Sequence, residues 1–590
     1  MFILDYALPI AFFLLLLCFY SLLPDLRSCR LPQRGTAERG GLLCHLPVLL
    51  LTLAYALTAF SQLGNRESPE SFEAMQGQTA HFTLTHPEEL SQLAVFHGVG
   101  AGSYELSYVA EDGSRTAESL EQSYIEVLKW QFVPVPATVP VREVEILCTA
   151  GSPWLGEIFL LDADGQPVPA VCDLPALCDE QAFLPESSHF MNSTYFDEIY
   201  HARTAWEHRE NLWPYEISHP PLGKLILGMG IELFGMTPFG WRFMGTLCGV
   251  LMLPLMYAFL RRLFGGTGVP FLGTLVFATD FMHFVQTRIA TIDSYSVFFI
   301  LLMYYFMYLY LSEDKLWALA LSGVSFGLGA ACKWICLYAG AGLGVLWLLH
   351  WLRIWRESRA PFSLKELLRS PFAFNCGFCL IFFVAVPALI YYLSYFPYGS
   401  AQGCRPFSGA YTRLVLENQQ FMFRYHEGVT AEHPYSSRWY QWLLNIRPIL
   451  YYLEYFDDGS RSSIAAFLNP ALCWGGLLFL PLLGYTAIAR KDRRAAFILL
   501  GFAAQLLPWV FIRRVTFAYH YFPSSLFLVL AVSYVFAILR DNRKKGLACA
   551  GAYAAVSLLL FLLFYPALSG APVNNELGTA LMGWLPTWPL

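Results

Sequence analysis

The chain has 590 residues, of which 56% are hydrophobic and 16% aromatic, and its formal net charge is -6. Charged residues make up only 14%, against about 25% in soluble domains, which excludes an ordinary soluble protein. The acidic balance indicates no nucleic-acid partner. Charge-free runs such as Phe12–Phe19, Leu247–Leu260 and Val556–Phe564 indicate an integral membrane protein, because a spanning helix needs about 20 apolar residues.

Hydropathy predicts about twelve spanning helices. The first run has neither a basic n-region nor an obvious cleavage site, so we interpret it as a retained helix rather than a signal peptide. A short break at Lys333 separates two of the helices. The predicted ranges are about 3–23, 42–62, 239–260, 268–285, 294–311, 315–332, 334–352, 372–396, 468–488, 494–512, 522–539 and 546–566.

Lysine and arginine gather in five short loops between the predicted helices. With twelve helices all five groups fall on one side, which the positive-inside rule assigns to the cytoplasm. Both termini and the two long polar segments, about 63–238 and 397–467, are then expected outside. The basic groups lie at residues 27–39, 261–262, 353–369, 490–494 and 540–545.

The first polar segment opens with a β-rich domain. Tyr104–Val109, Val141–Cys148 and Glu157–Leu161 read as short strands, and Asp112-Gly113 and Asp164-Gly165 supply turns. We expect a small β-sandwich over roughly 70–180, serving as a packing or spacer domain or, alternatively, binding a sugar or a partner. An extracytoplasmic location would allow a disulfide among Cys148, Cys172 and Cys178.

These features predict six segments. Two transmembrane helices (1–62) precede the extracytoplasmic β-rich domain (63–185) and a first loop (186–238) that carries an acidic pair and an interfacial helix. Transmembrane helices (239–396), a second extracytoplasmic loop (397–467) and the C-terminal transmembrane helices (468–590) follow.

Ionisable residues cluster around the first loop and the outer helix ends. Asp197 and Glu198 are adjacent, and the amphipathic stretch Leu225–Phe234 is expected to lie along the membrane interface. An acidic pair suits a general base, and cations suit a leaving phosphate. The alternatives are an ion pair within the loop that holds Arg288 and Asp293, and arginines that snorkel to headgroups. The outward cations are Arg242, Arg288, Lys333, Arg513 and Arg514.

The order of these motifs resembles the protein O-mannosyltransferases, glycosyltransferase family 39, which have the GT-C fold. The resemblance covers roughly 190–540 and its motifs occur in family order. It is carried by Phe196-Asp197-Glu198, His219-Pro220-Pro221-Leu222-Gly223-Lys224, Trp241-Arg242, Arg288-Ile289-Ala290 with Asp293, Lys333-Trp334, His433 to Trp442, Asn469-Pro470 and Tyr519-His520-Tyr521-Phe522-Pro523-Ser524.

The hydropathy and strand patterns predict a polytopic α-helical membrane protein with about 12 transmembrane helices and an extracytoplasmic β-sandwich-like domain inserted after the second helix. The resemblance implies that its fold is of the GT-C type. It implies an inverting transfer of mannose from polyprenyl-phosphate-mannose to Ser or Thr of exported proteins, with Asp197 as base and Glu198 as its helper. Arg242 is assigned to the carrier phosphate. The further candidates for phosphate or sugar contacts are His219, Lys224, Arg288, Lys333, Arg513 and His520.

The sequence departs from the eukaryotic pattern in two respects. The second loop is too short for the trefoil-like lumenal domain of the eukaryotic members, and the extra domain here precedes the acidic pair. This arrangement is expected of a bacterial member in the plasma membrane, with the active site outside and membrane lipids around the helices. No cofactor or metal is expected besides the lipid-linked donor. A glycolipid or cell-wall polymer as acceptor, a related sugar, or a lipid or sugar transporter are the alternatives.

Overall fold

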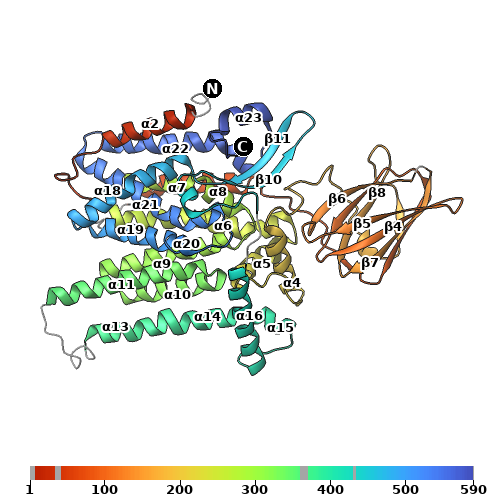
Figure 1. Cartoon of the computed structure of the whole chain (residues 1–590), viewed down its shortest axis with the longest axis horizontal. Helices are drawn as coiled ribbons and strands as arrows, with labels where there is room; N and C mark the ends of the chain where they lie inside the picture. Colours follow the sequence, from red (N-terminus) through yellow and green to blue (C-terminus); the bar gives the residue numbers. More distant parts are fainter. Residues whose placement is uncertain (1–6, 33–40, 138, 359–369, 429–432, 589–590) are drawn as a thin grey trace. The chain divides into compact units, whose positions relative to one another are not determined.

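The protein is described from a computed structural model of the chain (Figure 1), covering residues 7–32, 41–137, 139–358, 370–428 and 433–588. Two compact units are described separately. The sandwich unit comprises Gln62–Glu216 and Lys224–Met244, and the membrane unit comprises Met1–Ser61, Ile217–Gly223 and Gly245–Leu590. Five predicted cytoplasmic basic residues lie outside the described residues: Arg34, Arg39, Arg359, Lys365 and Arg369.

The sandwich unit begins with two antiparallel sheets, of strand order β1-β8-β3-β6 and β5-β4-β7-β2-β9. The predicted strands fall within β4, β7 and β8. The predicted turn at Asp112-Gly113 joins β4 to β5, with Gly113 at a φ of 82° that suits glycine. The strands are β1 (Glu73–Ala74), β2 (Thr79–Glu88), β3 (Gln92–His97), β4 (Gly102–Ala110), β5 (Arg115–Gln122), β6 (Lys129–Pro134), β7 (Val141–Gly151), β8 (Trp154–Leu161) and β9 (Ala170–Cys172).

Side chains from both sheets form one buried core. Tyr104 and Leu106 of β4 point into it at alternate positions, as do Leu93 and Val95 of β3 in the other sheet. Burying each such side chain contributes about 1.5–3 kcal/mol, so the two inner faces hold the sheets together. The disulfide that an extracytoplasmic location would allow is not formed in this structure: Cys148, Cys172 and Cys178 are all free thiols.

Helix α4 (Glu198–Arg209) packs on the sandwich through aromatic rings. Trp206 of α4 lies 5.7 Å from Phe72 and 5.5 Å from Trp154, measured between ring centroids, and both contacts are edge-on. Helix α5 (Leu222–Phe234) follows, where an interfacial helix was predicted, and then α6 (Pro238–Phe264) begins. The sandwich therefore supports the loop and helix that carry the acidic pair.

The membrane unit is a helical bundle (Figure 1), and nine of the helices in the described ranges are long and apolar enough to cross a membrane. Two shorter apolar helices, α2 (Ala7–Ser21) and α10 (Leu316–Cys332), and a bent pair complete the set, and each falls on one of the twelve predicted ranges. The nine spans are Leu43–Phe60, Pro238–Phe264, Asp293–Glu313, Ile335–Glu357, Pro371–Ala401, Ala471–Ala489, Arg493–Phe511, Ala518–Asn542 and Gly546–Ser569.

The bundle is built around helix α21 (Phe522–Asn542), in which every residue from Phe522 to Leu539 is buried. A helix that is apolar on all sides belongs at the centre of a bundle. The other elements used below are α3 (Leu46–Phe60), α7 (Gly268–Ala278), α8 (Phe281–Arg288), α9 (Asp293–Glu313), α11 (Ile335–Ser358), α16 (Gly409–Gly428), β10 (Ile449–Tyr455) and β11 (Ser460–Ala466). Strands β10 and β11 form a hairpin.

Helices α7 and α8 meet at an angle of 56°, and buried polar groups hold the bend. Asp280 accepts hydrogen bonds from the backbone N–H of His283 (3.2 Å) and of Asn469 (3.0 Å). The Asn469 amide donates to the carbonyls of Thr279 (2.8 Å) and Ser557 (3.0 Å). A break inside a membrane helix frees backbone groups that need new partners, and the Asn469-Pro470 motif supplies them here.

One strand of the sandwich carries a buried carboxyl group. Glu157 of β8 is fully buried and accepts hydrogen bonds from the Glu180 N–H (3.1 Å) and the Gln181 side chain. Burial raises the pKa of Glu157 to about 7, and the neighbouring carboxylates of Asp179 and Glu180 add to the shift.

Glu157→Gln should therefore reduce the pH dependence of the sandwich's stability. The folded unit binds the Glu157 proton more tightly than the unfolded chain does. The stability that the protonated Glu157 contributes is therefore fully present below the ordinary pKa of 4.5 and is lost as the pH rises through about 7. Hydrogen exchange in β8, corrected for its intrinsic rate, should show less loss of protection with rising pH in the variant than in the parent. Glu105→Gln, at an exposed position of β4, is the matched control. Equal loss of protection in parent and Glu157→Gln would contradict this account.

Candidate active site

The acidic pair lies where a loop of the sandwich unit enters α4. Phe196 precedes it with a φ of 50°, a left-handed conformation that costs a bulky residue about 1–3 kcal/mol and that its surroundings must enforce. The loop is tied to the segment that enters β6: the Thr194 N–H donates to the Leu128 carbonyl (3.1 Å), and the Trp130 N–H donates to Ser193 Oγ (3.2 Å). The sandwich thus fixes the backbone that presents the two carboxylates.

Glu198 and Arg242 form a buried ion pair in the same unit, with 0% and 1% of their surfaces exposed. Arg242 Nε and Nη2 donate to the two carboxylate oxygens of Glu198, each at 2.7 Å. The guanidinium also donates to the carbonyls of Leu63 (2.8 Å), Phe190 (2.7 Å) and Ser193 (3.0 Å). All five of its N–H donors are therefore used within the protein.

This geometry gives no support to the prediction that Arg242 binds the carrier phosphate, which stays a prediction. A phosphate oxygen would have to displace a carboxylate or a carbonyl from a fully buried guanidinium, and the displaced group would lose its partner. Glu198 likewise has both oxygens on Arg242. The two residues hold the loop together, and the neighbouring Asp197 is the member of the acidic pair that stays partly exposed.

Lys224 is also removed from the surface. Its ammonium group is fully buried and donates to the carboxylate of Glu216 and to the main-chain carbonyl of the same residue (2.7 Å). Burial, with the nearby charge of Lys224, lowers the pKa of His208 to about 3. The prediction that Lys224 contacts phosphate or sugar likewise stays a prediction without support from this geometry, because the ammonium charge is already paired inside the protein.

In the membrane unit, Lys333 and Asp293 form a second ion pair. Lys333 lies in the break between α10 and α11, and its Nζ is 2.8 and 2.9 Å from the two carboxylate oxygens of Asp293, the first residue of α9. The ammonium group also lies 5.4 Å from the centroid of the Tyr519 ring. Ionisable residues inside a membrane are expensive and are normally paired, and here the pair lies where two helix ends meet.

Histidines and a second cation gather near Lys333. The rings of His219 and His426, the latter on α16, lie 5.1 Å apart. Burial lowers the pKa of His426 to about 3, and the neighbouring His219, Arg514 and Lys333 add to this effect. We call His219, Lys333, His426 and Arg514 the cation cluster. Its members can donate hydrogen bonds to an anionic group.

His520 packs beside tryptophan rings in the same unit. Its ring centroid lies 6.0 Å from that of Trp442, with the planes nearly parallel, and 4.3 Å from that of Trp509. Its Nδ1 is 3.0 Å from the Phe517 carbonyl. This histidine is held in one orientation by its neighbours.

Two predicted arginines lie elsewhere. Arg288 is buried and donates to the carbonyls of Ala59 (3.0 Å) and Ser61 (2.9 Å), so it closes the end of α3. Asp293 pairs with Lys333, and the alternative of an Arg288–Asp293 pair is therefore wrong. Arg513 is exposed, whereas the charge of its neighbour Arg514 contributes to the lowered pKa of His426. Sequence reasoning missed His426, which has no motif around it and meets His219 only through the tertiary placement of α16.

Among the described residues, two sets of side chains are spaced closely enough to hold a metal ion, and both lie in the sandwich: His81 with Glu143 and Glu145, and Glu157 with Asp179 and Glu180. In the first set Glu145 is already paired with Arg115 at 2.7 Å. Neither set includes a residue of the acidic loop.

Comparison with known proteins identifies the family. A family model described as dolichyl-phosphate-mannose-protein mannosyltransferase matches residues 218–391. A second, described as the C-terminal four TMM region of protein-O-mannosyltransferase, matches residues 412–588, and together they match more than half of the chain. The chain belongs to the protein O-mannosyltransferase family. The sandwich and the acidic pair lie before both matched ranges of this family member.

Bacterial relatives and a yeast structure agree with this family. The polyprenol-phosphate-mannose–protein mannosyltransferases of Mycolicibacterium smegmatis and Mycobacterium tuberculosis are each 26% identical, and the matches cover 67% of this chain and 87% and 86% of theirs. The Saccharomyces cerevisiae protein O-mannosyltransferase Pmt1-Pmt2 complex, bound to the sugar donor, has a TM-score of 0.57 at 15% identity, covering 67% of this chain and 89% of that chain. The predictions of the family, of a multi-pass GT-C membrane fold and of a glycosyltransferase are confirmed.

The organising role of Arg242 in this family member can be tested with Arg242→Lys. Lysine keeps the charge but cannot reproduce the five-donor geometry, so buried carbonyls lose their partners and we expect the unfolding free energy to fall by about 3–5 kcal/mol. Thermal unfolding of the purified protein measures this. Arg424→Lys, at an exposed position of α16, is the control and should leave stability nearly unchanged. Unaltered stability of Arg242→Lys, with only a raised KM for the donor, would restore the phosphate role.

Proposed function

We propose that this protein is an inverting glycosyltransferase that moves mannose from a polyprenyl-phosphate carrier to Ser or Thr hydroxyls of exported proteins. The reaction takes place on the extracytoplasmic side of the plasma membrane. The match covers almost nine tenths of each mycobacterial relative named above. The names of these relatives support polyprenyl-phosphate-mannose as the donor and protein as the acceptor. The single observation that carries the assignment of the base is the contrast within the acidic pair: Glu198 is fully buried with both carboxylate oxygens bonded to Arg242, whereas Asp197 is partly exposed.

Asp197 serves as the general base. It accepts the proton of the acceptor hydroxyl as that oxygen attacks C1 of the sugar, and the C1–O bond to the carrier phosphate breaks on the opposite face. The products are the glycosylated hydroxyl with inverted anomeric configuration and the polyprenyl phosphate. Because Phe196 and the start of α4 fix the backbone on both sides of Asp197, the carboxylate needs little reorganisation to act.

The cation cluster stabilises the leaving phosphate. Lys333 and Arg514 supply positive charge, and His219 and His426 supply N–H donors. His426 is neutral in the free protein because its pKa is low, and a bound phosphate would favour its protonated form. His520, held between aromatic rings, serves as a sugar or phosphate contact, and Arg288, Arg242 and Lys224 position the surrounding backbone.

Asp197→Asn should abolish transfer while leaving the fold intact. The amide cannot take the hydroxyl proton, and loss of a general base typically lowers the rate by roughly 10²–10⁴-fold. The measurement is label transfer from polyprenyl-phosphate-mannose in membranes, followed separately into protein and into lipid or polymer fractions. Asp112→Asn, in the β4–β5 turn, is the matched control. If Asp197→Asn still transferred label to protein at the parental rate, Asp197 would not be the base. If the parent placed label only in the lipid or polymer fraction, the acceptor would be a lipid or polymer and not a protein.

Lys333→Gln should weaken use of the donor. Removing one charged hydrogen bond to phosphate is worth about 1.5–3 kcal/mol, so the KM for the donor should rise roughly ten- to hundredfold. Since the change also leaves Asp293 unpaired, the double variant Lys333→Gln with Asp293→Asn separates the two effects: it should recover stability but not donor affinity.

Lys315→Gln is the matched control, because this lysine lies at the opposite end of α10 and is half exposed. Steady-state kinetics at varied donor concentration give the comparison. An unchanged donor KM in the double variant would show that Lys333 acts only through its ion pair.

A further inference from the structure

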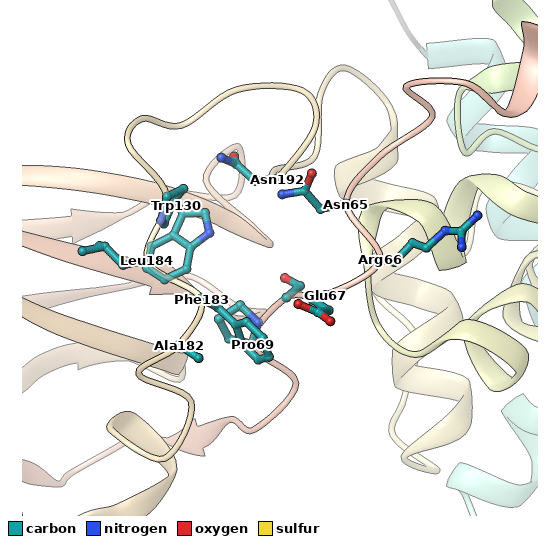
Figure 2. A pocket seen from close by; sticks show the side chains of 11 residues that line it. Asn65, Arg66, Glu67, Pro69, Trp130, Ala182, Phe183, Leu184 and Asn192 are labelled. Atoms are coloured by element: carbon teal, nitrogen blue, oxygen red, sulfur yellow. The ribbon is translucent and has the colours of Figure 1, made fainter.

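The sandwich unit contains a pocket that the reaction described above does not use. Its cavity volume is about 430 Å³. Figure 2 shows Trp130, Asn65, Asn192 and Glu67 around it, and Phe183 with Pro69 below. It is bounded by the chain that leaves α3, by strand β6 and by the segment that follows β9.

Four polar groups of the pocket lack a protein partner among the described residues. Ser68 is only 6% exposed, and its hydroxyl makes no hydrogen bond. The indole N–H of Trp130, the side-chain amide of Asn65 and the carboxylate of Glu67 also make no hydrogen bond to a described residue, but Asn65 and Glu67 are exposed, so Ser68 holds the one buried unpartnered group among these four. A buried hydroxyl without a partner is costly, so its place in a pocket wall indicates a ligand that satisfies it.

The remaining lining is apolar or already satisfied. Asn192 donates to the Ser187 carbonyl (2.7 Å) and accepts from the His189 N–H (3.0 Å), so it serves as a fixed wall. Phe183 and Pro69 add apolar surface. The guanidinium of Arg66 lies over the Phe239 ring, 4.7 Å from its centroid, which leaves it at the rim.

The pocket shares its walls with the acidic loop. The Asn65 N–H donates to the carbonyl of Met191 (2.7 Å), and Trp130 bonds to Ser193. Leu63, two residues before Asn65, gives its carbonyl to Arg242. A ligand in the pocket would therefore be held by the same backbone that presents Asp197.

We propose that this pocket binds one neutral sugar residue. Sugar hydroxyls both donate and accept, which matches the pocket's mixture of free acceptors at Glu67 and Ser68 and free donors at Trp130 and Asn65. An anionic ligand would meet the Glu67 carboxylate without a dedicated cation, and a purely apolar ligand would leave the four polar groups unsatisfied.

The sugar is one that the acceptor already carries, and this step rests on the proposed function. A hexose seated in the pocket would bring the neighbouring hydroxyls of the same acceptor to the loop of Asp197 and raise their effective concentration. The enzyme would then use an acceptor that is already mannosylated in preference to a bare one.

Binding is tested first, without donor, on the full-length protein in detergent. Saturation-transfer NMR with methyl α-mannoside should show binding that weakens about fivefold in Ser68→Ala, the effect of one lost hydrogen bond. Because the Ser68 hydroxyl has no partner in the free protein, this variant should fold as stably as the parent. Ser463→Ala removes an equally buried, unpartnered hydroxyl in β11 of the membrane unit and should leave binding unchanged.

Trp130→Phe is the second variant, since it keeps a ring in the wall and removes only the N–H donor. Weaker mannoside binding in both variants, with parental binding in Ser463→Ala, supports the pocket. Absence of mannoside binding to the parent protein, or equal binding in all three variants, overturns it. Equally strong competition by a bare Ser/Thr peptide would also overturn it, since the pocket would then be a peptide site.

Transfer is compared next on a Ser/Thr peptide and on the same peptide carrying one mannose. The parent should use the mannosylated peptide at a lower KM, and Ser68→Ala should lose that advantage while keeping its rate on the bare peptide. Equal use of both peptides by the parent contradicts the acceptor role. If no peptide is glycosylated at all, the proposed function fails, whereas the binding experiment still decides whether the sugar pocket exists.

Discussion

The buried ion pair of Arg242 and Glu198 is the contact on which the candidate site depends. Taking two charges out of water costs several kcal/mol for each, so such a pair persists only when every donor and acceptor is satisfied. Here one guanidinium joins the start of α6 to the start of α4 and to three backbone carbonyls from two other segments. Backbone carbonyls in irregular loops lack the hydrogen-bond donors that a helix or sheet provides. The N–H groups of Arg242 serve as those donors here.

The membrane unit solves the same problem at its helix breaks. In the break between α10 and α11, Lys333 forms an ion pair with Asp293. At the bend between α7 and α8, Asp280 and Asn469 form hydrogen bonds with the freed backbone groups. In lipid no water is present to satisfy these groups, so broken helices need side chains of this kind. Two of the family motifs, Lys333-Trp334 and Asn469-Pro470, therefore lie at interrupted helices and supply side chains that stabilise the interruption.

Sequence reasoning reached the architecture because apolar periodicity is a strong pattern. Twelve apolar runs, the alternation in Tyr104–Val109 and the Asp-Gly turns all led to the observed elements. Roles of side chains were harder. Arg242 donates to backbone carbonyls, which every residue type carries, so the amino-acid sequence does not reveal these partners. The partner of Lys224 is Glu216, which belongs to no recognised motif. His426 enters the cation cluster through the path of α16, which only tertiary structure fixes.

The attachment of the sandwich explains why a domain before the acidic pair would act on the acceptor. Its hydrogen bonds go to residues 191–194 of the loop, a few positions before Asp197, and its aromatic contacts go to Trp206 of α4. Within its own unit the sandwich therefore bears on the residues that would receive the hydroxyl proton. A domain that served only as a spacer would need no polar pocket in the wall it shares with that loop, and it would gain nothing from leaving the buried Ser68 hydroxyl unpaired.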